Sequence, residues 1–228
     1  FLYMSGFSTE WEDIYLNGEQ LTSWPWSDVI SLMHRYCKDV VSKKSVVFEL
    51  GCGVGPNIPF IQSLGMNYYG VDGSSTAIEN LHQKFPKLIN QTSVSDFTNI
   101  ECYSRIPGVD IAIDRAAITH NNLNAIKQIL ENIYNVLKSG GYFVGIDWFS
   151  TKHFSSKMGS KSVDENTRVN IDSGQFKNVG NVHFSDEEEL RKLFSNFDII
   201  VLEEKVINSF VSQNNNQFAS WNIVARKK

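Results

Sequence analysis

A glycine-rich segment, ELGCGVGPN at residues 49–57, has the spacing of a turn that brings backbone amides close to a ligand. Glu49 precedes the first glycine, and Asp72 ends the next apolar run, NYYGVD at residues 67–72. A carboxylate at that place accepts hydrogen bonds from a ribose diol in nucleotide and nucleoside sites. Glu49 would repel a pyrophosphate but could order the loop or attract an ammonium group. Both acids therefore suit a ligand with ribose, adenine and an amino-acid end, and without phosphate.

A dinucleotide site is the alternative interpretation of this turn. Its fingerprint is G-x-G-x-x-G, whereas the glycines here follow G-x-G-x-G and Pro56 takes the sixth position. Tyr134 and Lys138 have the Y-x-x-x-K spacing of short-chain dehydrogenases. We expect this pair in the last turns of a helix that runs away from the ligand edge of the sheet. A nicotinamide oxidoreductase is therefore disfavoured.

Apolar runs and helical periodicities alternate along most of the chain, which predicts an α/β fold with an open, mostly parallel sheet. Two strands in succession at the end indicate one antiparallel strand. Thr9 and Glu12, and again Ser185 and Glu188, have the spacing of a capping box at a helix start. Strands are expected over 45–51, 67–72, 88–94, 109–115, 142–149, 199–207 and 218–226, with an Asn-rich turn between the last two, and helices over 9–18, 27–41, 57–64, 77–85, 123–138 and 185–194.

Between Ser150 and Phe184 no clear periodicity appears. A loop of that length is often a lid or a binding loop, with disorder as the alternative. Open α/β sheets bind ligands at the strand ends from which this segment emerges, which favours a lid. We expect a single domain, with residues 1–44 as a helical arm over the cofactor, 45–228 as the core and 151–184 as a lid on the acceptor side.

The composition excludes several classes of protein. Of 228 residues, 42% are hydrophobic and 20% charged, and the net charge of −4 argues against a protein that coats nucleic acid. No apolar run is long enough to span a membrane, and the first seven residues are too short for a signal-peptide core. Three cysteines, Cys37, Cys52 and Cys102, make a disulfide framework improbable. We expect a cytoplasmic protein.

Five segments stand in the order seen in class I S-adenosylmethionine-dependent methyltransferases, and the chain resembles that family. They are ELGCGVGPN, YYGVDGSS, SVSDF, DIAIDRAAITH and LKSGGYFVGIDW. The resemblance implies a Rossmann-like seven-stranded sheet, helices on both faces and an antiparallel last strand. It also implies S-adenosylmethionine as cofactor, S-adenosylhomocysteine as product and no metal.

The resemblance also assigns site residues. Gly51 and Gly53 would approach the methionine end, Asp72 would take the ribose hydroxyls, and Asp96 with Phe97 would bracket the adenine. The full set of expected cofactor contacts is Trp24, Trp26, Glu49, Gly51, Cys52, Gly53, Asn57, Asp72, Gly73, Ser74, Asp96, Phe97 and Arg115. Structural roles are the alternatives: Asp72 as a helix cap, Asp96 as a turn residue, the two tryptophans as core and Cys52 as a buried filler.

Methyl transfer to a hydroxyl requires a base near the acceptor, and His120 follows the fourth strand at the ligand edge. Its alternative role is in capping or loop structure. Candidates for binding the acceptor are Arg115, His153, Arg168 and His183. DRAA follows the fourth strand where amino-methylating nucleic-acid enzymes carry [DN]PP[YF], so nucleic-acid acceptors are discounted.

The terminal segments are similar to methyltransferases of bacterial surface-polysaccharide pathways. They are YLNGEQLTSWPWSDVISLMHRY and GNVHFSDEEELRKLF with ASWNIVA. This similarity favours O-methylation of a sugar or another capsule precursor, such as a nucleotide-activated sugar. Phosphoramidate, phosphate or thiol acceptors remain alternatives, as does a non-catalytic scaffold that binds the cofactor. The oligomeric state is not predicted.

Overall fold

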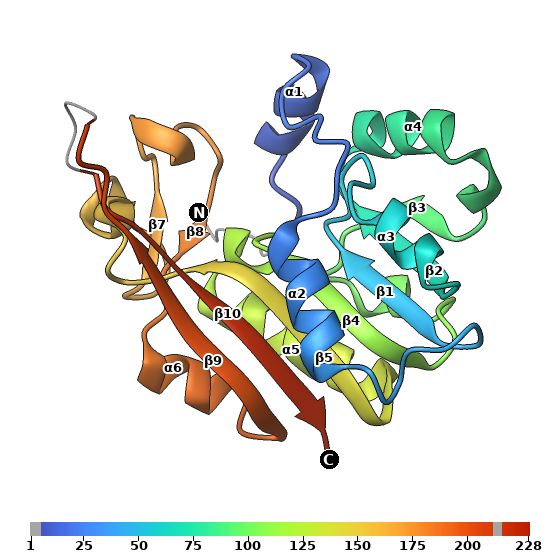
Figure 1. The fold of residues 1–228 in the computed structure, drawn as a ribbon. Coiled ribbons are helices and arrows are strands. Elements are labelled where there is room, and N and C mark those ends of the chain that lie inside the picture. The colour runs from blue at the N-terminus through green and yellow to red at the C-terminus, as the bar shows by residue number, and fades with distance from the viewer. Residues whose placement is uncertain (1–5, 212–215) are drawn as a thin grey trace.

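Seven strands form one sheet in the order β3-β2-β1-β4-β5-β10-β9 (Figure 1). The structure is a computed structural model that describes residues 6–211 and 216–228. Strands β1 to β5 run parallel to one another, and β10 is antiparallel to both of its neighbours. This arrangement confirms the predicted Rossmann-like fold. The strands are β1 (Val46–Leu50), β2 (Asn67–Asp72), β3 (Thr92–Val94), β4 (Val109–Arg115), β5 (Leu137–Phe149), β9 (Phe197–Ile207) and β10 (Phe218–Lys227).

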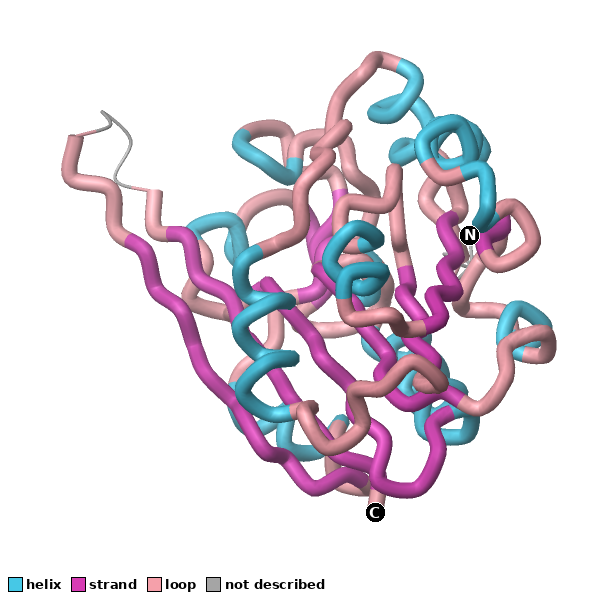
Figure 2. The backbone as a smooth tube through the Cα atoms, turned by 45° about the vertical axis from the view of Figure 1, so that its right-hand side comes forward, coloured by secondary structure: helices cyan, strands magenta, loops and turns pink. Residues whose placement is uncertain are grey.

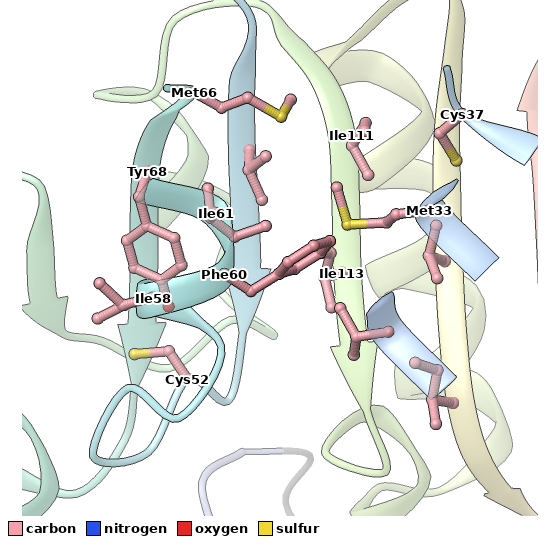
Figure 3. Packing of buried hydrophobic residues seen from close by; sticks show 14 of the residues in the cluster. Met33, Cys37, Cys52, Ile58, Phe60, Ile61, Met66, Tyr68, Ile111 and Ile113 are labelled. Carbon is pink, nitrogen blue, oxygen red and sulfur yellow. The ribbon is translucent and has the colours of Figure 1, made fainter. Parts of the chain in front are cut away.

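Helices cover both faces of this sheet (Figures 1 and 2). One face carries α2 (Ser27–Tyr36), α3 (Ile58–Ser63) and α4 (Ser75–Lys84), and the other carries α5 (Leu123–Val136) and α6 (Glu187–Leu193). Figure 3 shows Met33 of α2 and Phe60 of α3 pointing onto the strands, close to Ile113. Burial of these apolar faces, at about 25 cal/mol per Å², holds the strand ends in fixed positions.

The segment after β5 is folded, although its sequence shows no periodicity. It contains the short turns η4 (Phe154–Lys157) and η5 (Gly174–Phe176) and the strands β6 (Ser160–Lys161), β7 (Thr167–Val169) and β8 (Val182–His183). These strands form a second, three-stranded sheet. Pieces of two or three residues are too short to produce a detectable period, which is why the sequence indicated only a loop.

The N-terminal arm contains α1 (Glu10–Leu16), which lies beside α4. The capping box expected at Thr9 and Glu12 does not form, because Glu12 accepts hydrogen bonds from Thr76 instead. The second capping box was predicted at Ser185 and Glu188, one residue too early, since Asp186 caps α6. Short 3-10 turns complete the fold: η1 (Pro86–Leu88), η2 (Ile100–Tyr103) and η3 (Ile118–His120).

Residues 1–5 of the arm and most of the Asn-rich turn, 212–215, lie outside the described residues. Within 6–211 and 216–228, no helix has the length and apolar character needed to cross a membrane.

Candidate active site

A cavity of about 400 Å³ opens at the carboxyl ends of the parallel strands. Two sides of it differ in chemistry. The side that we call the carboxylate side carries Glu49, Gly51, Gly53, Asp72 and Asp96, and the side that we call the aromatic side carries Trp11, His120, Phe149, Phe176 and Phe218. The segment at residues 151–184, which we call the insert, contributes to the cavity together with the arm, the strand ends and the start of β10. The site is therefore assembled from segments along most of the chain.

The glycine turn follows β1 and is held in a left-handed backbone conformation. The φ angles are 62° at Gly51 and 52° at Gly53, a region in which a side chain is strained. A Cβ on Gly51 would overlap Ala117, and one on Gly53 would lie 2.7 Å from the hydroxyl of Tyr15. Both glycines are therefore required by the conformation and by the close approach of neighbouring segments.

Asp72 holds this turn in place from the end of β2. Its Oδ2 accepts a hydrogen bond from Gly53 N and its Oδ1 one from Ser74 N, both at 2.9 Å. Burial raises the pKa of Asp72 to about 6, although these hydrogen bonds oppose the shift. Ser74, and not Asp72, caps α4, because its hydroxyl accepts from Ala77 N at 3.0 Å. The alternative role of Asp72 as a helix cap therefore does not hold.

Glu49 orders the turn from the end of β1. Its Oε1 accepts from Asn57 Nδ2 at 2.7 Å and its Oε2 from the Tyr68 hydroxyl at 2.6 Å. Asn57 in turn accepts a hydrogen bond from Trp26 N at 3.1 Å, which ties the arm to the turn. Burial raises the pKa of Glu49 to about 7. Asn57 does not line the cavity, so its role is to position Trp26 and Glu49.

Asp96 and Phe97 follow β3 and both line the cavity. Asp96 Oδ1 accepts from Thr98 N at 2.9 Å, as a turn residue does, and Oδ2 accepts from Phe7 N at 3.0 Å. A carboxylate offers about four acceptor sites, so Asp96 retains capacity for a further donor.

Arg115 stands at the end of β4 between the two sides. Its guanidinium lies 3.8 Å from the ring centre of Trp26, and its Nη2 is 3.2 Å from Asp147 Oδ2. The Nε of Arg115 is buried and has no hydrogen-bond partner among the described residues. Arg115 also lines the cavity, and a guanidinium there is a suitable contact for an anionic group of a ligand. Trp24, in contrast, is 77% exposed and does not line the cavity, so neither a core role nor a cofactor contact is supported for it.

His120 ends the turn η3 and faces the aromatic side. Its Nδ1 lies 3.0 Å from the carbonyl oxygen of Asn181, and because a carbonyl only accepts, Nδ1 carries the proton. Ring centroids of Trp11 and Phe149 lie 4.9 and 5.6 Å from that of His120. Burial lowers the pKa of His120 to about 4, and the Arg115 cation acts in the same direction. The imidazole is therefore neutral at pH 7, with Nε2 as its acceptor atom.

The other predicted acceptor residues do not reach the cavity. His153 is buried behind the aromatic side, with 5.0 Å between its ring centroid and that of Phe176. Arg168 donates to a backbone carbonyl of the insert. His183 is fully buried and lies 2.7 Å from Glu189 through Nε2. These polar groups bind the insert to itself and to α6.

Several lining residues were not predicted from the sequence. Apart from Asp147, Gln175 and the hydroxyl of Tyr15, they are mostly apolar, and a sequence does not distinguish such residues from core. Their only signals in the sequence were their places in the N-terminal arm, at the end of β5, at the start of β10 or in the segment without periodicity. They include Phe7, Trp11, Tyr15, Asp147, Phe149, Gln175, Phe176, Val179 and Phe218.

The Y-x-x-x-K pair lies far from this cavity, as expected. Lys138 Nζ is 2.7 Å from Asp110, whose carboxylate also binds the amide of Val46 at the start of β1. The pair therefore marks the opposite edge of the sheet. Among the described residues, no group of three or more His, Cys, Asp or Glu is placed to hold a metal ion.

Comparison with known proteins finds similarity to methyltransferases. Residues 48–145, from β1 to β5, match the sequence model of a family described as a methyltransferase domain. The matched segment contains the glycine turn, Asp72 and Asp96. No curated protein sequence matches the chain.

Solved structures of methyltransferases share the fold at low sequence identity. A SAM-dependent methyltransferase from Anabaena variabilis has a TM-score of 0.67 and 15% identity, over 97% of this chain and 93% of that one. One from Methanosarcina mazei has a TM-score of 0.65 and 17% identity, over 90% and 98%. The 1,6-didemethyltoxoflavin-N1-methyltransferase of Burkholderia thailandensis, solved with 1,6-didemethyltoxoflavin and S-adenosylhomocysteine, has a TM-score of 0.62 and 16% identity, over 96% and 86%.

Proposed function

We propose that the protein transfers a methyl group from S-adenosylmethionine to a hydroxyl of a small molecule, a sugar or another precursor of a surface polysaccharide. One observation carries this proposal: a single cavity joins the carboxylates of Asp72 and Asp96 to the neutral imidazole of His120. The first two residues match a nucleoside-binding pattern, and the third is a base in reach of the same space.

The residues present fit the proposed cofactor. Asp72 and Asp96 would accept hydrogen bonds from its ribose and its adenine amino group. The guanidinium of Arg115, which lines the cavity, would donate to its carboxylate. When bound, S-adenosylmethionine supplies an electrophilic methyl group on a sulfonium. The glycine turn and the arm hold the ligand and exclude water, which methyl transfer requires.

His120 takes the role of general base in this proposal. Its Nδ1 is held by the carbonyl of Asn181, which fixes the ring and leaves Nε2 to accept a proton from the acceptor hydroxyl. With a pKa of about 4 the imidazole is unprotonated across the neutral range, so the lone pair of Nε2 is available.

The walls of the aromatic side support a small acceptor. Trp11, Phe149 and Phe176 offer flat apolar faces, and Asn121 and Gln175 add hydrogen-bonding groups. A sugar presents both C–H faces and hydroxyls to such a surface. The methyltransferase from Burkholderia thailandensis, whose structure holds a small heterocycle, also favours a small molecule over a macromolecule. The choice of a sugar rests on the similarity of the terminal segments.

Calorimetry with S-adenosylhomocysteine and with NAD tests the cofactor. We expect binding of the first alone, and binding of NAD alone would overturn the proposal. Incubation with S-adenosylmethionine and a panel of nucleotide-activated sugars, phosphoramidates and thiols then tests the acceptor. Release of S-adenosylhomocysteine with a sugar supports the proposal, release with a thiol or phosphoramidate replaces its acceptor class, and silence across the panel favours a scaffold.

His120→Asn tests the base. We expect turnover to fall about 100-fold or more, as on loss of a general base, with unchanged S-adenosylhomocysteine binding. His34→Asn, at an exposed position on α2, is the matched control. In the unsubstituted enzyme kcat at saturating substrates should stay level from pH 8 to 5.5, whereas a histidine of pKa about 6.5 would lose about tenfold. Near-normal turnover of the variant would remove His120 from this role.

A further inference from the structure

The ring of Phe7, in the arm, lies where a side chain at position 73 would lie. Gly73 directly follows Asp72, and a Cβ built on Gly73 would overlap the ring of Phe7 at three of its carbon atoms. The backbone of Gly73 does not have a positive φ, so a side chain is excluded there by the ring and not by conformation. The arm thus supplies from residue 7 the apolar group that β2 lacks at its end.

Two contacts fix the arm on either side of Gly73. The amide of Phe7 donates to Asp96 Oδ2 at 3.0 Å. Glu12 Oε1 accepts from the hydroxyl of Thr76 at 2.6 Å and from its amide at 3.3 Å. Because Thr76 lies in the first turn of α4, these bonds hold the segment between Phe7 and Glu12 against both β3 and α4.

A second phenyl ring lines the same part of the cavity. Phe97 follows Asp96, and its Cε1 lies 3.9 Å from a Cβ built on Gly51. Phe7 therefore lies at Gly73, next to Asp72, and Phe97 lies near Gly51 of the glycine turn. Asp96 accepts a hydrogen bond from the amide of Phe7 and directly precedes Phe97 in the sequence. Flat aromatic side chains are the groups on which purines stack.

We infer that Phe7 forms a wall of the purine site. This inference rests on the proposed cofactor. An adenosyl group whose amino group bonds to Asp96 and whose ribose bonds to Asp72 would lie next to Gly73. Phe7 covers the purine there because Gly73 has no side chain with which to do so. The same contact makes purine binding and docking of the arm mutually stabilising, since Asp96 bonds to Phe7.

Calorimetry with S-adenosylhomocysteine and with 5′-methylthioadenosine tests this role. Phe7→Ala should weaken both ligands by about 5- to 100-fold, the range for loss of one base-stacking side chain. The two ligands should lose the same factor, because they share the adenosyl part. Phe210→Ala, at a position 93% exposed, is the matched control and should leave both affinities unchanged.

A rescue variant separates a specific wall from general damage to the arm. In Phe7→Ala/Gly73→Leu the leucine side chain fills the vacated space from β2, and we expect it to restore part of the affinity. In the chain that retains Phe7, Gly73→Leu should weaken binding, because ring and side chain overlap. Circular dichroism confirms that each variant is folded.

The outcomes distinguish the inference from the function on which it rests. If the unsubstituted protein binds neither ligand, the proposed cofactor fails and the inference fails with it. If it binds both and Phe7→Ala binds equally well, the cofactor stands and the wall is refuted. Tighter binding by Phe7→Ala would also refute it, because the ring would then occupy the place of the purine itself.

Discussion

On the carboxylate side of the cavity, backbone turns are held by single carboxylates, whereas on the aromatic side rings from three separate segments pack around one histidine. Asp72 binds amides only nineteen residues before it and two after it. On the other side Trp11, Phe149 and Phe176 meet at His120 from the arm, β5 and the insert. A hydrogen bond to a backbone amide needs its acceptor in a narrow range of distance and angle, but a packed aromatic wall can change shape with each residue. Substitutions of the carboxylates should therefore lower cofactor affinity, whereas substitutions of the aromatic rings around His120 should change which acceptor fits.

On the carboxylate side, a large effect on cofactor affinity is expected at Asp72. Asp72→Asn removes the charged acceptor and presents an amide N–H to either Gly53 N or Ser74 N, so S-adenosylhomocysteine affinity should fall about 10- to 100-fold. Asp110→Asn is the control: Asp110 also accepts from a backbone amide, Val46 N at 2.7 Å, but at the opposite edge of the sheet. Calorimetry on both variants measures the effect. Equal losses would show that stability of the sheet, and not the turn, governs binding.

The residues that the sequence identified are those whose neighbours lie close along the chain. The glycine turn and Asp72 are recognisable because a strand, a turn and an acid follow one another in a fixed order. Glu12 was misjudged, because its three-residue spacing from Thr9 is the same whether its carboxylate caps its own helix or binds α4. Spacing gives the separation along the chain and not the direction of a side chain.

The residues of the aromatic side could not be predicted from the sequence for the same reason. His183 and Arg168 are polar residues in a segment without periodicity, and the sequence offered no way to see that they bind within the insert and to α6. Phe149 and Phe176 are buried, and they also line the cavity. A buried aromatic residue becomes a wall only through the empty space beside it, and that space is a property of the assembled fold.

A smaller effect is expected where the two sides meet, at Trp26. Trp26→Ala removes the ring under Arg115, a contact worth about 0.5–2 kcal/mol, and the guanidinium is then positioned by Asp147 alone. S-adenosylhomocysteine affinity should fall about 2- to 30-fold. Trp24→Ala, two residues away and exposed, should change it less than twofold. If calorimetry showed equal losses, the arm would act as a whole and the cation–π contact would not matter.

The smallest effect concerns the stability of the unbound protein. Burial holds the pKa of Glu49 at about 7 in the folded state, above its ordinary 4.5, so the folded protein binds this proton more tightly than the unfolded chain. The stabilisation is complete below pH 4.5 and is lost as the pH rises through 7. Between pH 5 and 6 the loss is about 1 kcal/mol, or about 2–4 °C in Tm.

Glu49→Gln removes this ionisation while it keeps the size of the side chain. Thermal unfolding at pH 5 and 6 should show a smaller decrease in Tm for this variant than for the unsubstituted protein, whereas exposed Glu79→Gln should leave the decrease unchanged. Asp72, with a pKa raised to about 6, contributes in the same direction in all three proteins and therefore cancels from the comparison. An identical pH dependence in Glu49→Gln would mean that the proton on Glu49 is not linked to folding.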